Sequence, residues 1–422
     1  METTNNNSKF QNSKKINLQT NRLLRYSIFG IIYLHQGFIE VFMYVYMALY
    51  LIRYNVNLAL IGLTIAIGTA PWIFKIFYGI LSDRKKIGNW GRRLPYMIIG
   101  SFFSALLFFM LIPVNPNAGW LIFAGLIFAA NFFNALCDTS TDGLVVDTTT
   151  PEKRGTAQSV CWGSKFGGYV IAAIMVGFFV EIFSWALYFL FMGIFLLVSL
   201  PFLFISREPP FELSEKFPWK DVKDTFKKRI VIIISLLFIF SEMGLYITLS
   251  MLPLYLSLDL GLSIEYVGII MALGSGGFVV GCAISGPILD RFSRRLSISI
   301  SLVFLSVMII IVALIQNLLD ALIFVFLAGI AWGFLQIAEM ILSMDICKKS
   351  ISATMFSVYM SILNLGIIIG TGLSGLLVEL VGFRMTFIIA SLIVLSNLIL
   401  ASLIKDTEDL FCEENEATLL KN

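Results

Sequence analysis

Long runs of apolar residues alternate with short polar segments along almost the whole chain. Each run has about 20 residues or more, the length that a helix needs to cross the hydrocarbon core of a bilayer. The pattern predicts an all-α membrane protein with twelve membrane-spanning helices. The predicted spans are 27–52, 58–82, 94–114, 119–147, 155–181 and 183–206, followed by 230–257, 264–289, 296–317, 320–345, 351–379 and 383–405.

The segment between the two sets of six spans has a different composition. Residues 207–229 are charged, contain three prolines and lack a spanning pattern. We expect them to be a cytoplasmic linker between an N-terminal six-helix bundle, 27–206, and a C-terminal one, 230–405. The polar, Asn-rich residues 1–26 predict a disordered tail without a cleavable signal peptide, and residues 406–422 predict a second tail.

Composition supports a membrane protein and argues against several other classes. Hydrophobic residues make up 58% of the chain and charged residues 14%, so a soluble fold would have no way to cover its apolar surface. The five cysteines have no paired or metal-like spacing, which predicts free thiols and no metal. We find no phosphate-binding glycine loop and no nucleophile with a base. The sequence therefore predicts neither an enzyme nor a nucleotide-driven pump, with no cofactor and no nucleic acid partner.

Basic residues gather in alternate loops. The predicted tail, the loop after the second span and the linker hold most of the Lys and Arg residues, whereas the opposite loops hold only Arg53 and Arg384. Because basic loops stay on the cytoplasmic side, both termini are predicted to be cytoplasmic. Two termini on the same side require an even number of spans, which agrees with the twelve predicted. We expect the plasma membrane as the location.

One short motif follows the second span of each half. Gly79, Asp83 and Arg84 have the same spacing as Gly286, Asp290 and Arg291, at a shift of 207 residues in a chain of 422. A repeat at about half the chain length predicts two homologous, pseudo-symmetric halves.

These loops resemble the loop after the second helix of the major facilitator superfamily of secondary transporters, which reads G-x-x-x-D-R-x-G-R-R. The second copy fits with Ser293 in place of a glycine, and the first has an insertion, 86–90, before its Gly-Arg-Arg. The resemblance implies a conformational latch, in which the Asp carboxylate accepts bonds from a facing helix N-terminus and a neighbouring Arg. The predicted latch residues are Gly79, Asp83, Arg84, Gly91, Arg92, Arg93, Gly286, Asp290, Arg291, Arg294 and Arg295.

Two narrower resemblances point to different branches of that superfamily. The ending W-G-R-R-L-P-Y, residues 90–96, resembles glycoside-pentoside-hexuronide cation symporters and plant sucrose transporters. Those symporters place cation-binding carboxylates on the second helix, where this chain has Lys75 and no Asp before Asp83. The stretch D-G-L-V-V-D-T-T-T-P-E-K-R-G-T-A-Q-S, residues 142–159, resembles the folate-biopterin and bacteriochlorophyll-related branches. The two resemblances leave the substrate open.

Polar side chains recur every three or four residues within several spans, so each set lies on one helix face. A charge near the bilayer midplane costs at least about 2.5–3.5 kcal/mol, so these faces are expected to line a water-filled cavity. The predicted substrate-binding residues are Gln36, Asn134, Asp138, Trp162, Lys165, Tyr169, Trp332 and Gln336. The predicted proton-coupling residues are Glu40, Asp138, Glu242 and Glu339.

The roles of the charged residues in the spans have alternatives. Asp138 close to Lys165 is expected to exchange a proton during transport, or to form a static ion pair that holds two helices together. Lys75 is expected to extend toward the cytoplasm.

Two further acids and one histidine have structural alternatives. Asp142 and Asp147, at the end of their span, are expected to pair with Arg154. His35, the single histidine of the chain, is expected either to relay protons or to pack as a polar side chain.

Two functions from different classes fit these patterns. The first is a monomeric secondary active transporter that moves a small polar organic solute through the bilayer by alternating access, coupled to protons. The second is a protein of the same fold that does not transport and acts as a receptor or assembly factor for a pigment, a lipid or a partner protein. The repeated latch motif and the charged cavity favour the transporter.

Overall fold

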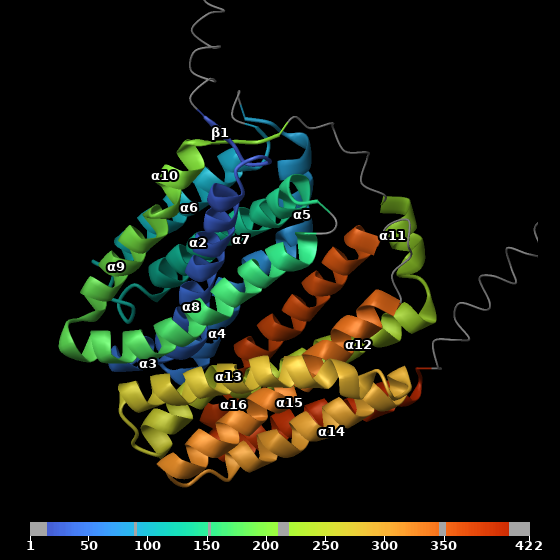
Figure 1. The fold of residues 1–422 in the computed structure, drawn as a ribbon. Helices are drawn as coiled ribbons and strands as arrows, with labels where there is room; N and C mark the ends of the chain where they lie inside the picture. The colour runs from blue at the N-terminus through green and yellow to red at the C-terminus, as the bar shows by residue number, and fades with distance from the viewer. Residues whose placement is uncertain (1–14, 88–90, 151–152, 210–218, 346–351, 405–422) are drawn as a thin grey trace, which may run out of the picture. The chain divides into compact units, whose positions relative to one another are not determined.

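The computed structural model describes residues 15–87, 91–150, 153–209, 219–345 and 352–404, and nearly all of them are helical (Figure 1). In chain order the elements are β1 (Ile16–Asn17), α2 (Arg22–Val41), η1 (Phe42–Tyr46), α3 (Met47–Arg53), α4 (Leu58–Thr69), η2 (Ala70–Phe74), α5 (Lys75–Arg84), α6 (Leu94–Leu111), α7 (Trp120–Thr148), α8 (Arg154–Ile182), α9 (Trp185–Leu197), α10 (Ser199–Phe204), β2 (Ser206–Arg207), α11 (Trp219–Thr225), α12 (Arg229–Leu254), η4 (Tyr255–Asp259), α13 (Ile264–Leu289), α14 (Arg294–Ala313), α15 (Leu318–Asp345) and α16 (Ser352–Ser402).

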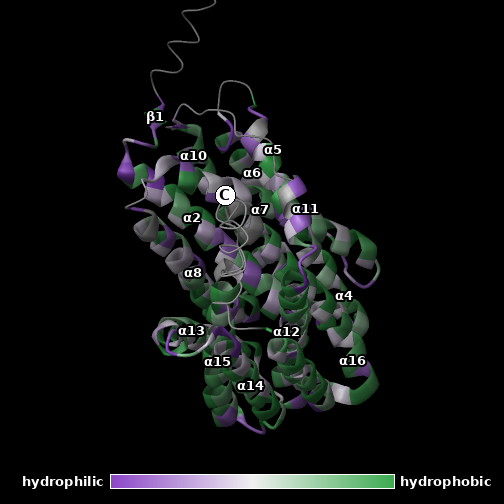
Figure 2. Ribbon diagram, turned by 90° about the vertical axis from the view of Figure 1, so that its right-hand side faces the viewer, coloured by the Kyte–Doolittle hydropathy of each residue, from purple (hydrophilic) through white to green (hydrophobic). Residues whose placement is uncertain are grey.

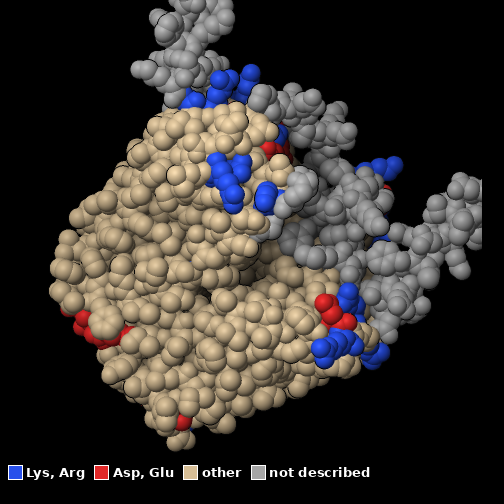
Figure 3. All heavy atoms as spheres, in the orientation of Figure 1, with Lys and Arg blue, Asp and Glu red and all other residues tan. Residues whose placement is uncertain are grey.

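Eleven helices in the described ranges are long and apolar enough to cross a membrane. Figure 2 shows that the long helices α12 to α16 are hydrophobic over most of their length. Large areas of the face in Figure 3 carry neither Lys and Arg nor Asp and Glu. A surface of this kind suits the hydrocarbon core of a bilayer, where an unpaired charge is costly. The prediction of an all-α, multi-pass membrane protein is confirmed.

The last of the eleven candidates, α16, contains two of the twelve predicted spans. It has 51 residues and would be ~77 Å long if straight, more than twice the thickness of a hydrocarbon core. Gly382 lies inside it with φ 78° and ψ 168°, a conformation that glycine adopts without the strain a side chain would add. Gly382 therefore divides α16 close to the predicted boundary between 351–379 and 383–405.

The chain divides into two compact units. Unit 1 consists of Met1–Val41, Phe74–Ala172 and Phe179–Phe217, and unit 2 of Phe42–Ile73, Ala173–Phe178 and Pro218–Asn422. In unit 1, α6 packs against α7 and α9, and α2 packs against α7 and α10. A buried apolar cluster joins α2, α6, α7 and α10 and includes Phe29, Met97, Leu144 and Leu203. In unit 2, α12 and α4 pack against α16, and α13 packs against α15.

The first two predicted spans are interrupted. Residues Phe42–Tyr46 form a π-helical turn between α2 and α3, and Ala70–Phe74 form a 3-10 helix between α4 and α5. Pro71 lies in the second interruption, where its missing N–H and its ring are incompatible with a regular α-helical ladder. The break determines the direction in which α5 starts, and Lys75 is its first residue.

Residues 16–26, which the sequence predicts as part of a tail, are folded in the structure. The strand β1 pairs in parallel with β2, and Leu18 N donates to Arg207 O at 3.0 Å. Leu18 is fully buried, and the Asn21 side chain caps the start of α2 by accepting from Leu24 N at 2.9 Å. The buried Leu18 and the Asn21 cap explain why these residues are folded although they precede the first apolar run.

Candidate functional site

Unit 1 contains a buried ionic network centred on Lys75 at the start of α5. The Lys75 ammonium group lies 2.7 Å from Asp138 Oδ2 and 3.1 Å from Asp142 Oδ2, both on α7. Gln36 Nε2, on α2, donates to Asp138 Oδ1 at 2.8 Å, and the Tyr33 hydroxyl donates to Asp142. Because 138 and 142 are one helical turn apart, one lysine reaches both carboxylates. Three helices are thus joined through a network in which Asp138 is buried and the Lys75 and Asp142 side chains are partly exposed.

A second ion pair joins α2 and α8. Lys165 Nζ lies 2.5 Å from Glu40 Oε1. The helices approach closely here because each has a glycine at the contact. A Cβ on Gly37 would lie 2.7 Å from Tyr169 N, and a Cβ on Gly168 would lie 2.7 Å from Leu34 O. This close backbone approach brings the two charged side chains within reach of each other.

Both ion pairs differ from the expected ones. Asp138 pairs with Lys75 instead of Lys165, and Lys165 pairs with Glu40. Lys75 therefore points to the α7 carboxylates, and the prediction that it extends toward the cytoplasm is wrong. The helix is interrupted at Pro71, and α5 begins after the interruption and packs against α7. A continuous helix, as expected from the sequence, would direct Lys75 differently.

The other predicted substrate residues of unit 1 differ in their surroundings. Asn134, one turn before Asp138, is buried, and its Nδ2 has no hydrogen-bond partner in the described structure. Trp162 is 46% exposed, and the Lys165 ammonium lies 5.2 Å from its ring centroid. Tyr169 lies on α8 at the contact with Gly37. The Asn134 amide therefore has a donor that a solute could use, and the Trp162 ring has an exposed face.

His35 is fully enclosed in unit 1. Its ring packs edge-on against Phe195 with the centroids 4.6 Å apart. Its Nε2 has no hydrogen-bond partner among the described residues. In this structure His35 therefore packs against an aromatic ring, which is the second of the two roles expected for it.

Unit 2 contains two buried acids that interact with each other. Glu242 on α12 is 3% exposed and Glu339 on α15 is 1% exposed. The Ser241 hydroxyl donates to Glu339 Oε1 at 2.5 Å, and the carboxyl groups of Glu242 and Glu339 are close enough to interact directly. Within the described ranges no Lys or Arg forms an ion pair with either acid. The pair is therefore electrostatically unlike the network of unit 1.

A row of aromatic rings in unit 2 has members on α12 and α15 and also on η1 and α13. The centroids of Tyr44 and Tyr246 are 5.3 Å apart, and those of Tyr246 and Trp332 are 6.4 Å apart. Phe278 follows at 4.3 Å from Trp332. The Trp332 Nε1 has no hydrogen-bond partner in the part of the chain described. Trp332 and the half-buried Gln336 lie one turn apart on α15, so Trp332 presents a flat apolar face and an unused N–H donor close to an amide.

The first latch loop forms a dense ionic cluster within unit 1. Arg93 forms an ion pair with Asp83 and donates to Ser82 Oγ at 2.7 Å. Asp147, at the end of α7, accepts from Arg92 Nη2 at 2.8 Å and from Arg93 Nε at 3.2 Å. The expected partner of Asp147 and Asp142 was Arg154, whose side chain, like that of Arg84, lies outside the described structure. Among the described side chains, Asp147 pairs with the loop arginines and Asp142 with Lys75.

Glu208 supplies a contact that the sequence analysis missed. Its carboxylate accepts from the backbone N–H groups of Arg92 at 2.9 Å, Arg93 at 2.7 Å and Leu94 at 2.5 Å, and so caps the start of α6. A Cβ on Gly91 would overlap this carboxylate, and Gly91 also has φ +112°. Burial raises the pKa of the Glu208 carboxyl, whereas the three N–H donors act in the opposite direction. Glu208 is one of five acids in the linker, and nothing in the sequence distinguishes it from the others for this role.

Replacing Glu208 by alanine is expected to destabilise unit 1 by about 1–2 kcal/mol, because three N–H groups lose their acceptor. Thermal unfolding of the purified protein in detergent measures the loss, and hydrogen exchange should speed up at the amides of Arg92 to Leu94. The matched control is Asp224→Ala, an acid on α11 whose pKa is lowered by its exposed pair with Lys227. Equal melting of the Glu208 variant and the wild type would contradict the capping role.

The second latch loop is much more open. Asp290 caps the end of α13, and its carboxylate lies 3.9 Å from Arg294 Nη1 at an exposed position. Arg291 and Arg295 are also exposed. Gly286 has nothing within 4 Å of the position of a Cβ, and Gly79 has only the Thr139 methyl group at 3.7 Å. The two copies of the motif thus have different surroundings, and their latch role stays a prediction.

No group of three or more His, Cys, Asp or Glu side chains in the described ranges is arranged to hold a metal ion.

Comparisons with known sequences give one family. The family model of the Major Facilitator Superfamily matches residues 26–370 and 234–410. The folate-biopterin transporter of Synechocystis sp. is 25% identical over 378 residues, covering 81% of this chain and 72% of that protein. The 4-hydroxybenzoate transporter PcaK of Acinetobacter baylyi is 29% identical over 134 residues, covering 32% of this chain and 29% of that protein.

Comparison with solved structures gives the same fold. The crystal structure of the nucleoside transporter NupG superposes with a TM-score of 0.73 and 15% identity, over 94% of this chain and 99% of that one. At this identity the likeness concerns the fold alone.

Proposed function

Because the chain belongs to the major facilitator superfamily, we propose that it is a secondary transporter that moves a small polar organic solute by alternating access, coupled to protons. Proteins of this architecture need no chemical step, since two helical bundles rock around a site near the bilayer midplane. We propose residues 27–206 and 230–405 as these bundles, and the loops around Asp83 and Asp290 as their latch. We also propose a plasma membrane location with both termini in the cytoplasm, in line with the distribution of basic residues.

The observation that carries proton coupling is the buried pair of Glu242 and Glu339. Two ionised carboxylates side by side repel each other strongly where water is excluded, so a pair without a cation is expected to hold a proton between its members. The Ser241 hydroxyl supports this role, because its oxygen lies 2.5 Å from Glu339 Oε1 and gives the acid pair a neutral hydrogen-bond partner instead of a cation. Entry of water during the transport cycle would allow the proton to leave.

The ionic network of unit 1 supports a different role. Lys75 lies 2.7 and 3.1 Å from Asp138 and Asp142, so the two acids share one fixed cation. We propose that Lys75, Asp138 and Gln36 hold α2, α5 and α7 together as one body during the rocking motion. Lys165 and Glu40, on α8 and α2, form a single ion pair. We propose that a charged solute displaces one of these two side chains from the other.

The aromatic row of unit 2 supports a solute with a planar ring. Tyr44, Tyr246 and Trp332 form continuous ring contacts, and the Trp332 N–H is an unused donor. A flat heteroaromatic ring stacks on such side chains and accepts from a free N–H. The relatives are named for folate and biopterin and for 4-hydroxybenzoate, all of which carry a planar ring. We propose this class of solute.

Uptake into proteoliposomes tests the proposed function. Purified protein is reconstituted, and folate, biopterin, 4-hydroxybenzoate and a nucleoside are offered as labelled solutes, with and without an imposed pH gradient. At least one of them should accumulate only when the gradient is present, and a protonophore should abolish the accumulation. Liposomes without protein are the control. Binding without uptake, for every solute and in both directions of the gradient, would favour the receptor function instead.

A further inference from the structure

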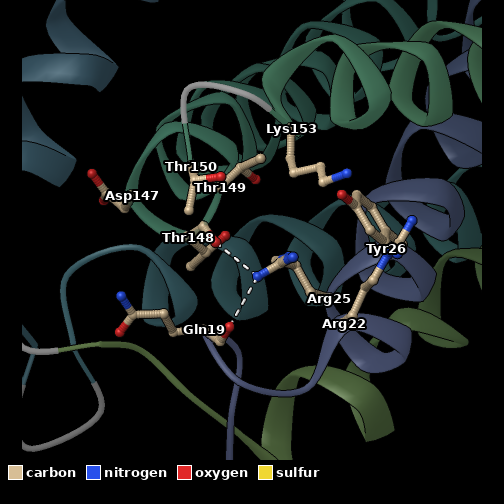
Figure 4. A pocket seen from close by; sticks show the side chains of 9 residues that line it. All are labelled: Gln19, Arg22, Arg25, Tyr26, Asp147, Thr148, Thr149, Thr150 and Lys153. Atoms are coloured by element: carbon tan, nitrogen blue, oxygen red, sulfur yellow. Dashed lines mark hydrogen bonds between the residues drawn. The ribbon is translucent and has the colours of Figure 1, made fainter.

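Unit 1 contains a basic pocket that shares only Asp147 with the ionic groups described above (Figure 4). It has a volume of about 390 Å³ and is lined by Gln19, Arg22, Arg25, Tyr26, Asp147, Thr148, Thr149, Thr150 and Lys153. The lining residues lie at the start of α2, at the end of α7 and just before α8. These are the ends of three candidate membrane spans. A pocket of this volume is within the range of small-molecule sites.

The pocket contains a buried cation with no carboxylate. Arg25 is 8% exposed, and its Nη1 donates to the carbonyl oxygens of Leu18, Gln19 and Thr148 at 3.2, 3.1 and 2.8 Å. Its Nε has no partner among the described residues. Carbonyl groups position the guanidinium without neutralising it, and a buried cation is stabilised when an anion completes its surroundings. The Arg25 side chain is therefore held in place with one N–H unused.

Two other cations reinforce this charge. The Arg22 and Arg25 guanidinium carbons lie 5.4 and 5.1 Å from the centroid of the same Tyr26 ring, and the exposed Lys153 also lines the pocket. The single lining acid, Asp147, is bound to Arg92 and Arg93. Within the described ranges no carboxylate forms an ion pair with Arg22, Arg25 or Lys153. The pocket therefore has three positive groups, while its acid is already neutralised from outside the pocket.

Neutral donors are also unused in this pocket. Thr149 is 5% exposed, and its hydroxyl has no hydrogen-bond partner among the residues described. The Tyr26 hydroxyl is buried and likewise has none within the described ranges. Both residues line the pocket. In the view of Figure 4 the Tyr26 hydroxyl and the Lys153 nitrogen point toward each other. A buried hydroxyl without a partner is destabilising, and a ligand with several acceptor oxygens would supply the missing partner.

We propose that this pocket binds a phosphate monoester group. Such a group has several acceptor oxygens and a charge of about −1.5 to −2 at neutral pH, which suits three cations, the free Arg25 Nε and two hydroxyl donors. Arg and Lys bind phosphate through charge-assisted hydrogen bonds. The group links the start of α2 to the segment between α7 and α8, so its binding stabilises that contact. The proposal does not depend on which solute the protein transports.

Two sources supply this chemistry. One is the headgroup of an anionic phospholipid, because the pocket lies at the ends of membrane spans, at the depth where headgroups are found. The other is a soluble phosphate monoester from the aqueous phase. If the ligand is a lipid, binding depends on the acyl chains as well as on the phosphate. If it is a soluble phosphate monoester, the phosphate group alone is sufficient.

The test measures binding to purified full-length protein in a neutral detergent, by native mass spectrometry and by the shift in melting temperature. The probes are dioleoyl phosphatidic acid, dioleoyl phosphatidylcholine and glycerol 3-phosphate. The variants are the double variant Arg22→Gln/Lys153→Gln, whose side chains are exposed, and Thr149→Val, which removes a hydroxyl without changing the side-chain shape. Lys227→Gln, an exposed cation of unit 2, is the matched control. Arg25 is left intact because three carbonyl contacts depend on it.

Phosphatidic acid is expected to bind the wild type and the Lys227 variant equally. It should bind about tenfold or more weakly to the double variant, and a few-fold more weakly to Thr149→Val, as expected from the loss of charge-assisted and neutral hydrogen bonds. Binding of glycerol 3-phosphate with the same variant dependence would support a soluble source, and its absence would support a lipid source. Equal binding of phosphatidic acid and phosphatidylcholine, or equal binding to the wild type and the double variant, would overturn the proposal.

Discussion

Replacing Lys75 by methionine is expected to cause the largest loss of stability of any single substitution in unit 1. The change removes the cation that lies 2.7 Å from Asp138 and 3.1 Å from Asp142, and it leaves two carboxylates facing each other. Breaking a buried ion pair by removing one partner costs about 3–5 kcal/mol. We expect a much lower yield of monodisperse protein in detergent and a markedly lower melting temperature.

Two further variants separate electrostatics from packing at Lys75. Lys227→Met removes a lysine from an exposed pair and should leave melting unchanged. The triple variant Lys75→Met/Asp138→Asn/Asp142→Asn should recover part of the stability, because neutral amides still bond to Gln36 and Tyr33. A triple variant no more stable than Lys75→Met would show that the lysine matters for its shape instead of its charge.

Replacing Glu339 by glutamine is expected to have the largest effect on transport. The substitution keeps the size of the side chain and an acceptor for the Ser241 hydroxyl, and its amide can donate to Glu242. It removes the carboxyl group that would share a proton with Glu242. The variant should fold and exchange labelled solute for unlabelled solute, but it should no longer accumulate solute in response to a pH gradient.

Exchange and accumulation are measured on the same proteoliposomes with the solute identified in the uptake experiment. Glu379→Gln is the matched control, since this exposed acid of unit 2 accepts from Ala59 N at 3.0 Å, outside the proposed coupling pair. It should accumulate solute as the wild type does. Accumulation by Glu339→Gln at wild-type level would exclude this acid from coupling. Loss of both exchange and accumulation, with normal melting, would indicate solute binding instead.

The span pattern was readable from the sequence because membrane helices are long and uniformly apolar. The 51-residue α16 shows the limit of such a reading. Hydropathy alone continues across Gly382, and the division depends on one backbone conformation. Interruptions at Phe42–Tyr46 and Ala70–Phe74 also leave hydropathy unchanged. Only Pro71 gives a sequence signal for the second one.

Pairings between charges were much harder to predict than the charges themselves. The sequence placed Asp138 and Lys165 on consecutive spans at similar depth, which suggested a pair. In the structure Gly37 and Gly168 bring α2 against α8, so Lys165 reaches Glu40. Which of several acids a lysine meets depends on helix rotation, and rotation depends on packing details such as these glycines. Glu208 was missed for another reason, since its partners are backbone N–H groups.

The order of synthesis gives the Lys75 network one further consequence. Asp142 follows Lys75 by 67 residues, and at about 5–20 residues per second its synthesis takes roughly 3 to 13 s more. The segment that carries Lys75 therefore emerges from the ribosome before either of its counter-ions exists. We expect the lysine to stay hydrated at the membrane surface during that interval, and the second span to reach its final depth only after the fourth has been made.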